Sequence, residues 1–216
     1  MQTSNHSAEK SQEIASALHA RELLRKQSRT NRRHLREKRR IAAKSVQGKS
    51  VGTEAYKATD KGFVKKNRLP GHFNQLINAA RQWAYTQNSY TDSKGVIRSL
   101  TSRGKRKLFE VLVVLLTTCD LMSGQIGKAL ALHMDTIKHD ALMLEHAKRF
   151  ESSMCSTSWY DYILILKDKN VFSGREIKVH GSDGVTVRSV ASYKWLSNDF
   201  LRKIGVYKDA IMASIK

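Results

Sequence analysis

The segment from Arg21 to Lys44 is the most basic part of the chain, with 11 Lys or Arg residues against two acids, Glu22 and Glu37. Residues 11–44 consist largely of helix formers and contain neither Gly nor Pro, so we expect them to form a helix. Like charges on successive turns repel one another, and the apolar positions are too sparse for a packed face: Ile14, Leu18, Leu23, Leu24, Leu35 and Ile41. The pattern therefore predicts a helix that is frayed or partly disordered when free and ordered on a polyanion.

The composition changes at Pro70, the only proline, which is followed by Gly71. The chain of 216 residues has a formal net charge of +20, and residues 1–68 carry +12 of it. We therefore predict a basic N-terminal arm and linker over residues 1–70, flexible from residue 45 onward, and a folded domain over residues 71–216. A surplus of this size indicates a nucleic acid or an anionic membrane surface as partner. The arm residues expected to bind the polyanion are Arg25, Arg29, Arg32, Arg33, Arg36, Arg39 and Arg40.

An anionic membrane surface is less favoured than a nucleic acid as the partner of this basic arm. The arm lacks the bulky apolar face of an interfacial helix, and no apolar run approaches the length that spans a bilayer. The N-terminus has no apolar signal core, and the two cysteines, Cys119 and Cys155, suit free thiols in a reducing compartment. We expect Cys119 to be buried and Cys155 to be reachable. The expectation is a soluble, cytosolic protein with no membrane contact.

Helical spacing of apolar residues predicts several helices after residue 70. They are expected over residues 71–85, 105–121, 140–150 and 157–170, with the most apolar, residues 105–121, at the centre. The first should bury one stripe, made of Phe73, Leu76, Ile77, Ala80, Trp83 and Ala84.

The remaining segments carry turn and strand patterns. Residues 88–104 are expected to be a turn-rich connector, and residues 123–140 fit either a short strand or a helix. Two alternating runs, residues 175–180 and 185–196, flank Gly-Ser-Asp-Gly and predict a β-hairpin. Residues 197–216 should close the chain as one or two short helices with Ser197 as N-cap. The fold class is mainly α with a small β-hairpin.

The order of these elements predicts a winged helix-turn-helix with residues 157–170 as its recognition helix. Ser156 or Thr157 is expected to cap this helix, and Asn170 to end it in the left-handed conformation. Trp159, Ile163 and Leu166 should face the core with Tyr162 beside them, followed in the core by Val171 and Phe172. Ser158, Asp161 and Ile165 should then point elsewhere. The residues expected to contact bases are Ser156, Thr157, Ser158, Tyr160 and Asp161.

Phosphate contacts are expected from basic residues outside the nearly uncharged recognition helix, since anchoring and base reading are separate tasks. One group lies on the hairpin and the other on a loop before the central helix. These residues are Arg175, Lys178, His180 and Arg188 on the hairpin, and Arg103, Lys105, Arg106 and Lys107 on the loop.

Residues 155–174, CSTSWYDYILILKDKNVFSG, followed by a basic hairpin, resemble the recognition helix and wing of plasmid and phage replication initiators of the winged-helix type. Residues 81–127 share the character of that group, so the resemblance extends from about Arg81 to Leu196. It implies a DNA-binding protein that binds repeated sites at an origin and recruits host replication proteins. A homodimer on DNA is one expected arrangement. It also implies a bacterial protein associated with the nucleoid or a plasmid. Many such initiators contain two winged-helix domains, and this chain has room for one.

Two alternatives to an initiator remain open. A winged-helix transcription regulator would need the same contact surface, so the sequence does not separate it from an initiator. An RNA-binding or ribosome-associated protein would use the arginine-rich arm equally well.

Catalysis and metal binding are not favoured by the spacing of the candidate residues. His133, His139 and His146 lie near Asp135, Asp140 and Glu145, but no HExxH or His-x-His pairing is present, so surface or satisfied histidines are expected. A DNA-nicking reaction would need a nucleophile such as Tyr160 or Tyr162 beside a metal-binding histidine pair. The Gly-Lys of residues 127–128 is followed by Ala129, which lacks the hydroxyl that holds magnesium in a phosphate loop. We therefore expect neither an enzyme nor a cofactor.

Overall fold

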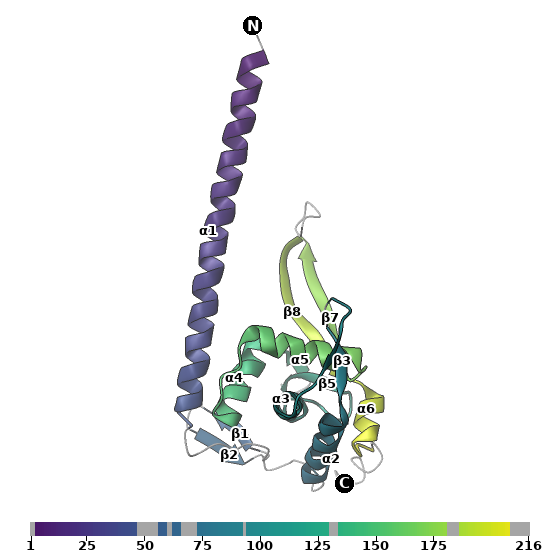
Figure 1. Cartoon of the computed structure of the whole chain (residues 1–216). Helices are drawn as coiled ribbons and strands as arrows, with labels where there is room; N and C mark the ends of the chain where they lie inside the picture. The colour runs from purple at the N-terminus through teal and green to yellow at the C-terminus, as the bar shows by residue number, and fades with distance from the viewer. Residues whose placement is uncertain are drawn as a thin grey trace. The chain divides into compact units, whose positions relative to one another are not determined.

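The computed structural model describes residues 3–46, 56–59, 62–65, 73–92, 94–129, 134–180 and 186–207. Six helices and eight strands lie within these ranges (Figure 1). The chain divides into two compact units, residues 1–38 and residues 39–216. The fold is mainly helical, as predicted, and its small antiparallel sheet contains the predicted hairpin as two of four strands. The change in composition predicts a domain boundary at residue 70, whereas the contacts within the folded chain place the boundary between residues 38 and 39.

The first unit consists of most of helix α1 (Thr3–Lys44). Leu18, Leu23 and Leu24 are exposed on it, in line with the prediction that apolar residues here are too sparse to pack. An ion pair, Glu22 with Lys26 at 3.3 Å, joins successive turns on the helix surface. This unit therefore gains little from apolar burial in its described part, and its basic side chains from Arg21 to Lys38 are exposed to solvent.

The second unit begins with the last turn of α1. Arg39, Ala42 and Ala43 are buried, and so is Val46 just beyond the helix. An antiparallel pair follows, β1 (Tyr56–Thr59) with β2 (Gly62–Lys65), within the segment expected to be only a linker. That expectation is corrected at these eight positions. Residues 47–55, 60–61 and 66–70 of the expected linker lie outside the described residues.

The two long helices of the core carry the predicted apolar faces. Helix α2 (Phe73–Thr86) buries the six residues predicted for it, Phe73 through Ala84 at helical spacing. Helix α3 (Ser102–Thr117) is buried on all sides from Leu108 to Thr117 and is the central helix. Between them, strands β3 (Ser89–Thr91) and β4 (Ile97–Ser99) pair within the segment expected to be a turn-rich connector.

A four-stranded antiparallel sheet packs with these helices. Its strands are β5 (Gln125–Ala129), β6 (Met134–Thr136), β7 (Phe172–His180) and β8 (Thr186–Leu196), in the order β6-β5-β8-β7. The strand alternative is thus the correct one for residues 125–129 and 134–136. Before β5 the chain passes close to β8 at Gly124, which has φ +75° and where a Cβ would lie 2.5 Å from the carbonyl oxygen of Leu196. Only glycine fits this crossing.

Helices α4 (His139–Phe150) and α5 (Ser156–Asp168) lie between β6 and β7 in the chain, as predicted. On α5, Trp159, Ile163 and Leu166 are buried, Tyr162 packs beside them, and Val171 and Phe172 are buried after the helix end, all as predicted. The prediction for Ile165 was wrong, because it is also buried.

The ends of α5 and of the last helix test the predicted caps. Asn170 has φ 53°, and the Val171 amide donates to the carbonyl of Leu166 at 2.8 Å, so the left-handed end of α5 is confirmed. The cap at its start is Cys155, not Ser156 or Thr157. Ser197 caps α6 (Asn198–Lys203), as predicted, by accepting from the Phe200 amide at 3.2 Å.

Candidate nucleic-acid interface

The exposed face of α5 is formed by Thr157, Tyr160 and Asp161. These positions are three and four residues apart and therefore adjoin on the helix surface. The Tyr160 side chain is 51% exposed, which is high for a ring of that size. The three residues present a hydroxyl, a phenol and a carboxylate to solvent at the start of the helix.

Ser156 and Ser158, two other predicted base contacts, are partly buried and already hydrogen-bonded. The Ser156 hydroxyl accepts from Nη2 of Arg39 at 3.3 Å. The Ser158 hydroxyl lies 3.1 Å from Sγ of Cys155, and the same sulfur accepts from the Ser158 amide at 3.5 Å. Ser158 therefore takes part in the cap that the exposed Cys155 forms at the start of α5. Ser156 instead anchors the end of α1 by binding Arg39.

The opposite face of α5 is fixed in the core through Trp159. Its Nε1 donates to Nδ1 of His139 at 3.0 Å, which requires an unprotonated Nδ1. Burial, followed by the charges of Lys194 and Lys167, lowers the pKa of His139 to about 4, so the ring is neutral at pH 7. The His139 ring also meets the Tyr160 ring edge-on, with centroids 5.1 Å apart. His139 thus positions both the buried and the exposed aromatic residue of α5.

Arg39 joins the end of α1 to the first turns of α4 and α5. Its Nη1 donates to Oδ1 of Asp140 at 3.3 Å and contacts Sδ of Met143 at 3.8 Å, while Nη2 reaches Ser156. The side chain is buried, and its Nε has no hydrogen-bond partner among the described residues. The prediction that Arg39 is an arm residue for polyanion binding is therefore corrected, because its guanidinium is used within the fold. The other six predicted arm residues are exposed on α1: Arg25, Arg29, Arg32, Arg33, Arg36 and Arg40.

The basic residues 103–107 form the start of α3 and not a loop, which is a second correction. Thr101 caps this helix by accepting from the Gly104 amide at 3.2 Å. Arg103 is exposed, while Lys105 donates to the carbonyl of Tyr85 at 3.0 Å and to Oδ1 of Asn88 at 2.7 Å. Lys105 therefore ties α3 to the end of α2.

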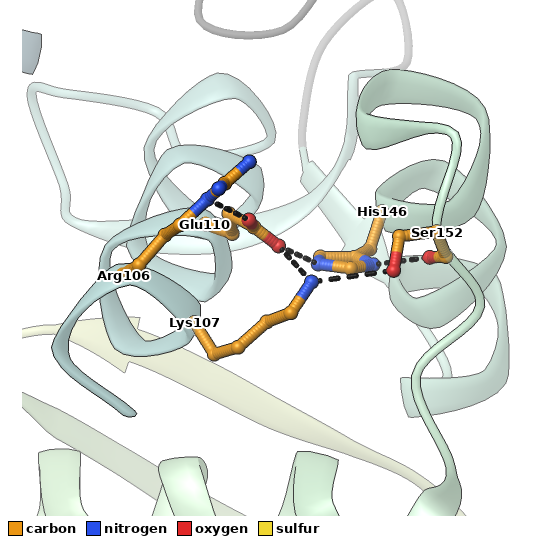
Figure 2. A network of polar contacts seen from close by, with 5 residues as sticks. All are labelled: Arg106, Lys107, Glu110, His146 and Ser152. Atoms are coloured by element: carbon orange, nitrogen blue, oxygen red, sulfur yellow. Dashed lines mark hydrogen bonds and ion pairs between the residues drawn. The ribbon is translucent and has the colours of Figure 1, made fainter. Parts of the chain in front are cut away.

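Lys107 and Arg106 both bind Glu110, a buried carboxylate one turn along α3 (Figure 2). Nζ of Lys107 lies 2.7 Å from Oε2 of Glu110 and 3.2 Å from the Ser152 hydroxyl. Nε of Arg106 lies 3.3 Å from Oε1 of Glu110, and the Arg106 side chain is 73% exposed. Of the four cations predicted here, Arg103 and Arg106 reach solvent, whereas Lys105 and Lys107 hold structural contacts.

His146 of α4 completes this network. Its Nε2 lies 2.9 Å from Oε2 of Glu110, and its Nδ1 lies 3.1 Å from the Ser152 carbonyl oxygen (Figure 2). Burial raises the pKa of Glu110, but hydrogen bonds from His146 and Lys107 outweigh it and leave the pKa below its usual value. Glu110 was not singled out in the sequence; the signal was a lone acid inside the otherwise apolar run from Leu108 to Leu116.

The hairpin of β7 and β8 follows α5 directly (Figure 1). Arg175 is exposed on β7, opposite Tyr193 of β8. Lys178 pairs in register with Ser189, Arg188 with Val179, and His180 with Thr186, so the predicted wing cations lie on paired strands. The side chains of Lys178, His180 and Arg188, and the turn at residues 181–185, lie outside the described residues.

Lys194 on β8 is a buried cation that the sequence reading missed. Its Nζ donates to the carbonyl oxygens of Ile137 at 2.6 Å and of Ser192 at 2.8 Å, and burial lowers its pKa to about 8. The available signal was strand alternation, which puts Lys194 in phase with the apolar Leu196 and out of phase with Tyr193 and Trp195.

The histidines and cysteines that could suggest a metal site have other contacts. His139 and His146 hold the hydrogen bonds described above, and His133 lies outside the described residues. Within the described part of the chain, no group of three or more His, Cys, Asp or Glu side chains is arranged to hold a metal ion. Cys119 is partly buried and its pKa is raised by burial, while Cys155 is exposed as expected.

Comparisons with known proteins do not place the chain in a family. No protein-family model matches it, and neither the curated proteins nor the solved structures that were searched contain a match. The helices within the described ranges include none that is both long enough and apolar enough to cross a membrane.

Proposed function

We propose that the protein binds duplex DNA in a sequence-specific manner through a winged helix-turn-helix, with α5 as the recognition helix. The order α3, β5, α4, α5, β7, β8, with β8 between β5 and β7, supports this proposal. It is the order of a three-helix unit whose third helix leads into a wing. The observation that carries the proposal is the exposed Thr157, Tyr160 and Asp161 face of a helix whose other face is locked by Trp159.

Phosphate binding is assigned to those of the predicted cations that reach solvent. Within the second unit, Arg40, Arg103, Arg106 and Arg175 are among the exposed cations. Arg39 anchors the end of the basic helix α1 to Ser156, the first residue of α5. Arg39 belongs to the second unit and lies at the same end of α5 as the proposed base contacts, and the basic arm that precedes it in the chain would add non-specific affinity for the duplex.

Within the DNA-binding class we favour a replication initiator of the plasmid or phage kind. The support is the sequence resemblance of residues 81–196. A transcription regulator would present the same contact surface. Binding to duplexes that carry iterated repeats from beside the gene distinguishes an initiator from a regulator. Only an initiator should occupy several adjacent repeats and recruit replication proteins.

The decisive experiment is selection of binding sites from a random duplex library, followed by anisotropy measurements on the enriched site. Enrichment of one sequence supports site-specific reading, and the logarithm of its affinity should fall with the logarithm of salt concentration with a slope of several units. Structured RNA of equal length serves as competitor. If no sequence is enriched and the RNA competes better than duplex, the proposal fails in favour of an RNA-binding protein.

Removal of residues 1–38 tests the role of the arm without touching Arg39. These residues form the first compact unit, so the second should retain its fold. We expect weaker binding and a smaller salt slope with site preference retained. A truncated chain that binds as strongly as the full chain would show that the arm does not contact the duplex.

A further inference from the structure

Two aromatic rings stack on the outward face of β8. The centroids of Tyr193 and Trp195 are 5.8 Å apart and their planes differ by 28°. Residues two apart on a strand share a face, and the intervening Lys194 is buried at 1% exposure on the other face. Tyr193 is 39% exposed and Trp195 is partly buried. The stack therefore lies on the side of the sheet opposite the core.

The neighbours of this stack are known from the strand register. Arg175 of β7 is opposite Tyr193, and Ser173 of β7 and Gln125 of β5 are opposite Trp195. Side chains directly opposite one another on paired strands share a face. Among these five described positions there is one cation, Arg175, and no carboxylate.

An exposed aromatic stack beside a cation matches the chemistry of an unpaired nucleotide. Bases stack on aromatic rings, while an arginine attracts the phosphate or packs on a ring. The bases of a duplex already stack on each other, so their faces are not available to such rings. The chain's net charge of +20 adds long-range attraction for any nucleic acid.

We propose that Tyr193, Trp195 and Arg175 form a stacking platform that binds single-stranded nucleic acid. The platform goes beyond the proposed reading of duplex DNA and does not depend on it, since it uses β7 and β8 instead of the exposed face of α5. Its ligand is an unpaired, sequence-tolerant strand, because every base offers a ring face.

Titration with an oligothymidylate of about 12 nucleotides, a typical length for one stacking surface, tests the platform. Tryptophan emission is a direct probe, because Trp83 and Trp159 are buried and Trp195 is the partly exposed one. We expect saturable quenching by the single strand. Tyr193→Ala should raise the Kd for the single strand about tenfold or more, as expected for loss of one stacked base. Tyr193→Phe keeps the ring and should bind as the unchanged protein does.

Tyr193→Leu keeps apolar bulk without a ring, and should behave as Tyr193→Ala if the latter proves unstable in a thermal melt. Tyr207→Ala removes a tyrosine outside the sheet that is even more exposed, 62% against 39% for Tyr193, and should leave the Kd unchanged. Binding of a duplex of the same length, measured in parallel, distinguishes the two proposals: the platform predicts a loss for the single strand only. An unchanged single-strand Kd in both Tyr193→Ala and Tyr193→Leu overturns the platform. Loss of self-association in those variants at unchanged Kd overturns it too, and assigns the face to a second copy of the chain.

Discussion

His146 and Glu110 form a buried hydrogen-bonded contact, with 2.9 Å between Nε2 and Oε2 and side chains that are 0% and 4% exposed. The other ring nitrogen of His146, Nδ1, lies 3.1 Å from the Ser152 carbonyl oxygen. The contact joins α3 to α4, and Lys107 places its ammonium group 2.7 Å from the same carboxylate oxygen.

Glu110→Gln should destabilise the second unit more than any change of a surface acid. Glutamine keeps the shape but leaves Lys107 without its counter-charge, and removing one partner of a buried pair costs about 3–5 kcal/mol. Urea unfolding followed by circular dichroism measures the loss of unfolding free energy. Glu22→Gln, which breaks an exposed pair with Lys26, should change it by less than about 1 kcal/mol. Equal stability of the Glu110→Gln and unchanged proteins would contradict a structural role for the network.

The stability of the protein should rise with pH between about 4 and 6.5 because of His139. Its pKa is lowered from 6.5 to about 4 in the folded protein, so in this window the unfolded chain binds more protons than the folded one. Protonation also removes the acceptor for Nε1 of Trp159. His139→Gln supplies an acceptor that does not titrate, so the slope of unfolding free energy against pH should become smaller in that variant. An unaltered slope would show that other groups cause the pH dependence.

Those features of the fold that depend on local pattern were predictable from the sequence. The buried stripe of α2, the left-handed Asn170 and the Ser197 cap each follow from spacing or from the conformational preference of one residue type. Features that depend on distant contacts were not. Helix geometry alone predicted that Ile165 points away from the core. It is nevertheless buried, because α5 is covered on more than one side.

The basic residues of the candidate site show the same limit. Charge density predicted cations, but not which of them would find partners in the fold. Arg39 and Lys107 have the same sequence context as their exposed neighbours, yet Asp140 and Glu110 engage them. Asp140 is 101 residues from Arg39 in the chain, and no local pattern connects the two. Exposed Arg36 and Arg103 remain candidates for phosphate contact.

Arg39 and Arg36 should separate the structural from the electrostatic role of the basic helix. Arg39→Ala removes a buried guanidinium from Asp140 and Ser156, and should lower the free energy of unfolding by about 2–3 kcal/mol. Arg36→Ala, on the exposed surface, should leave stability unchanged within about 0.5 kcal/mol. It should instead reduce the slope of log affinity against log salt by about one unit if Arg36 meets a phosphate. Chemical denaturation measures the change in unfolding free energy, and salt titrations on duplex DNA measure the change in slope. Equal changes of both quantities in the two variants would contradict the assignment of a structural role to Arg39 and an electrostatic role to Arg36.

Asp161→Ala tests whether the exposed face of α5 contacts bases. A carboxylate near phosphates lowers affinity for every sequence, but one that accepts from a cytosine amino group favours particular sites. We expect the alanine variant to change the sequence enriched from a random duplex library, with about 1–3 kcal/mol of discrimination lost at one base pair. Asp168→Ala removes the same charge from the other end of α5 and should leave the preferred sequence unchanged. If Asp161→Ala merely tightens binding to all duplexes equally, Asp161 faces the backbone and base reading rests on other residues of α5.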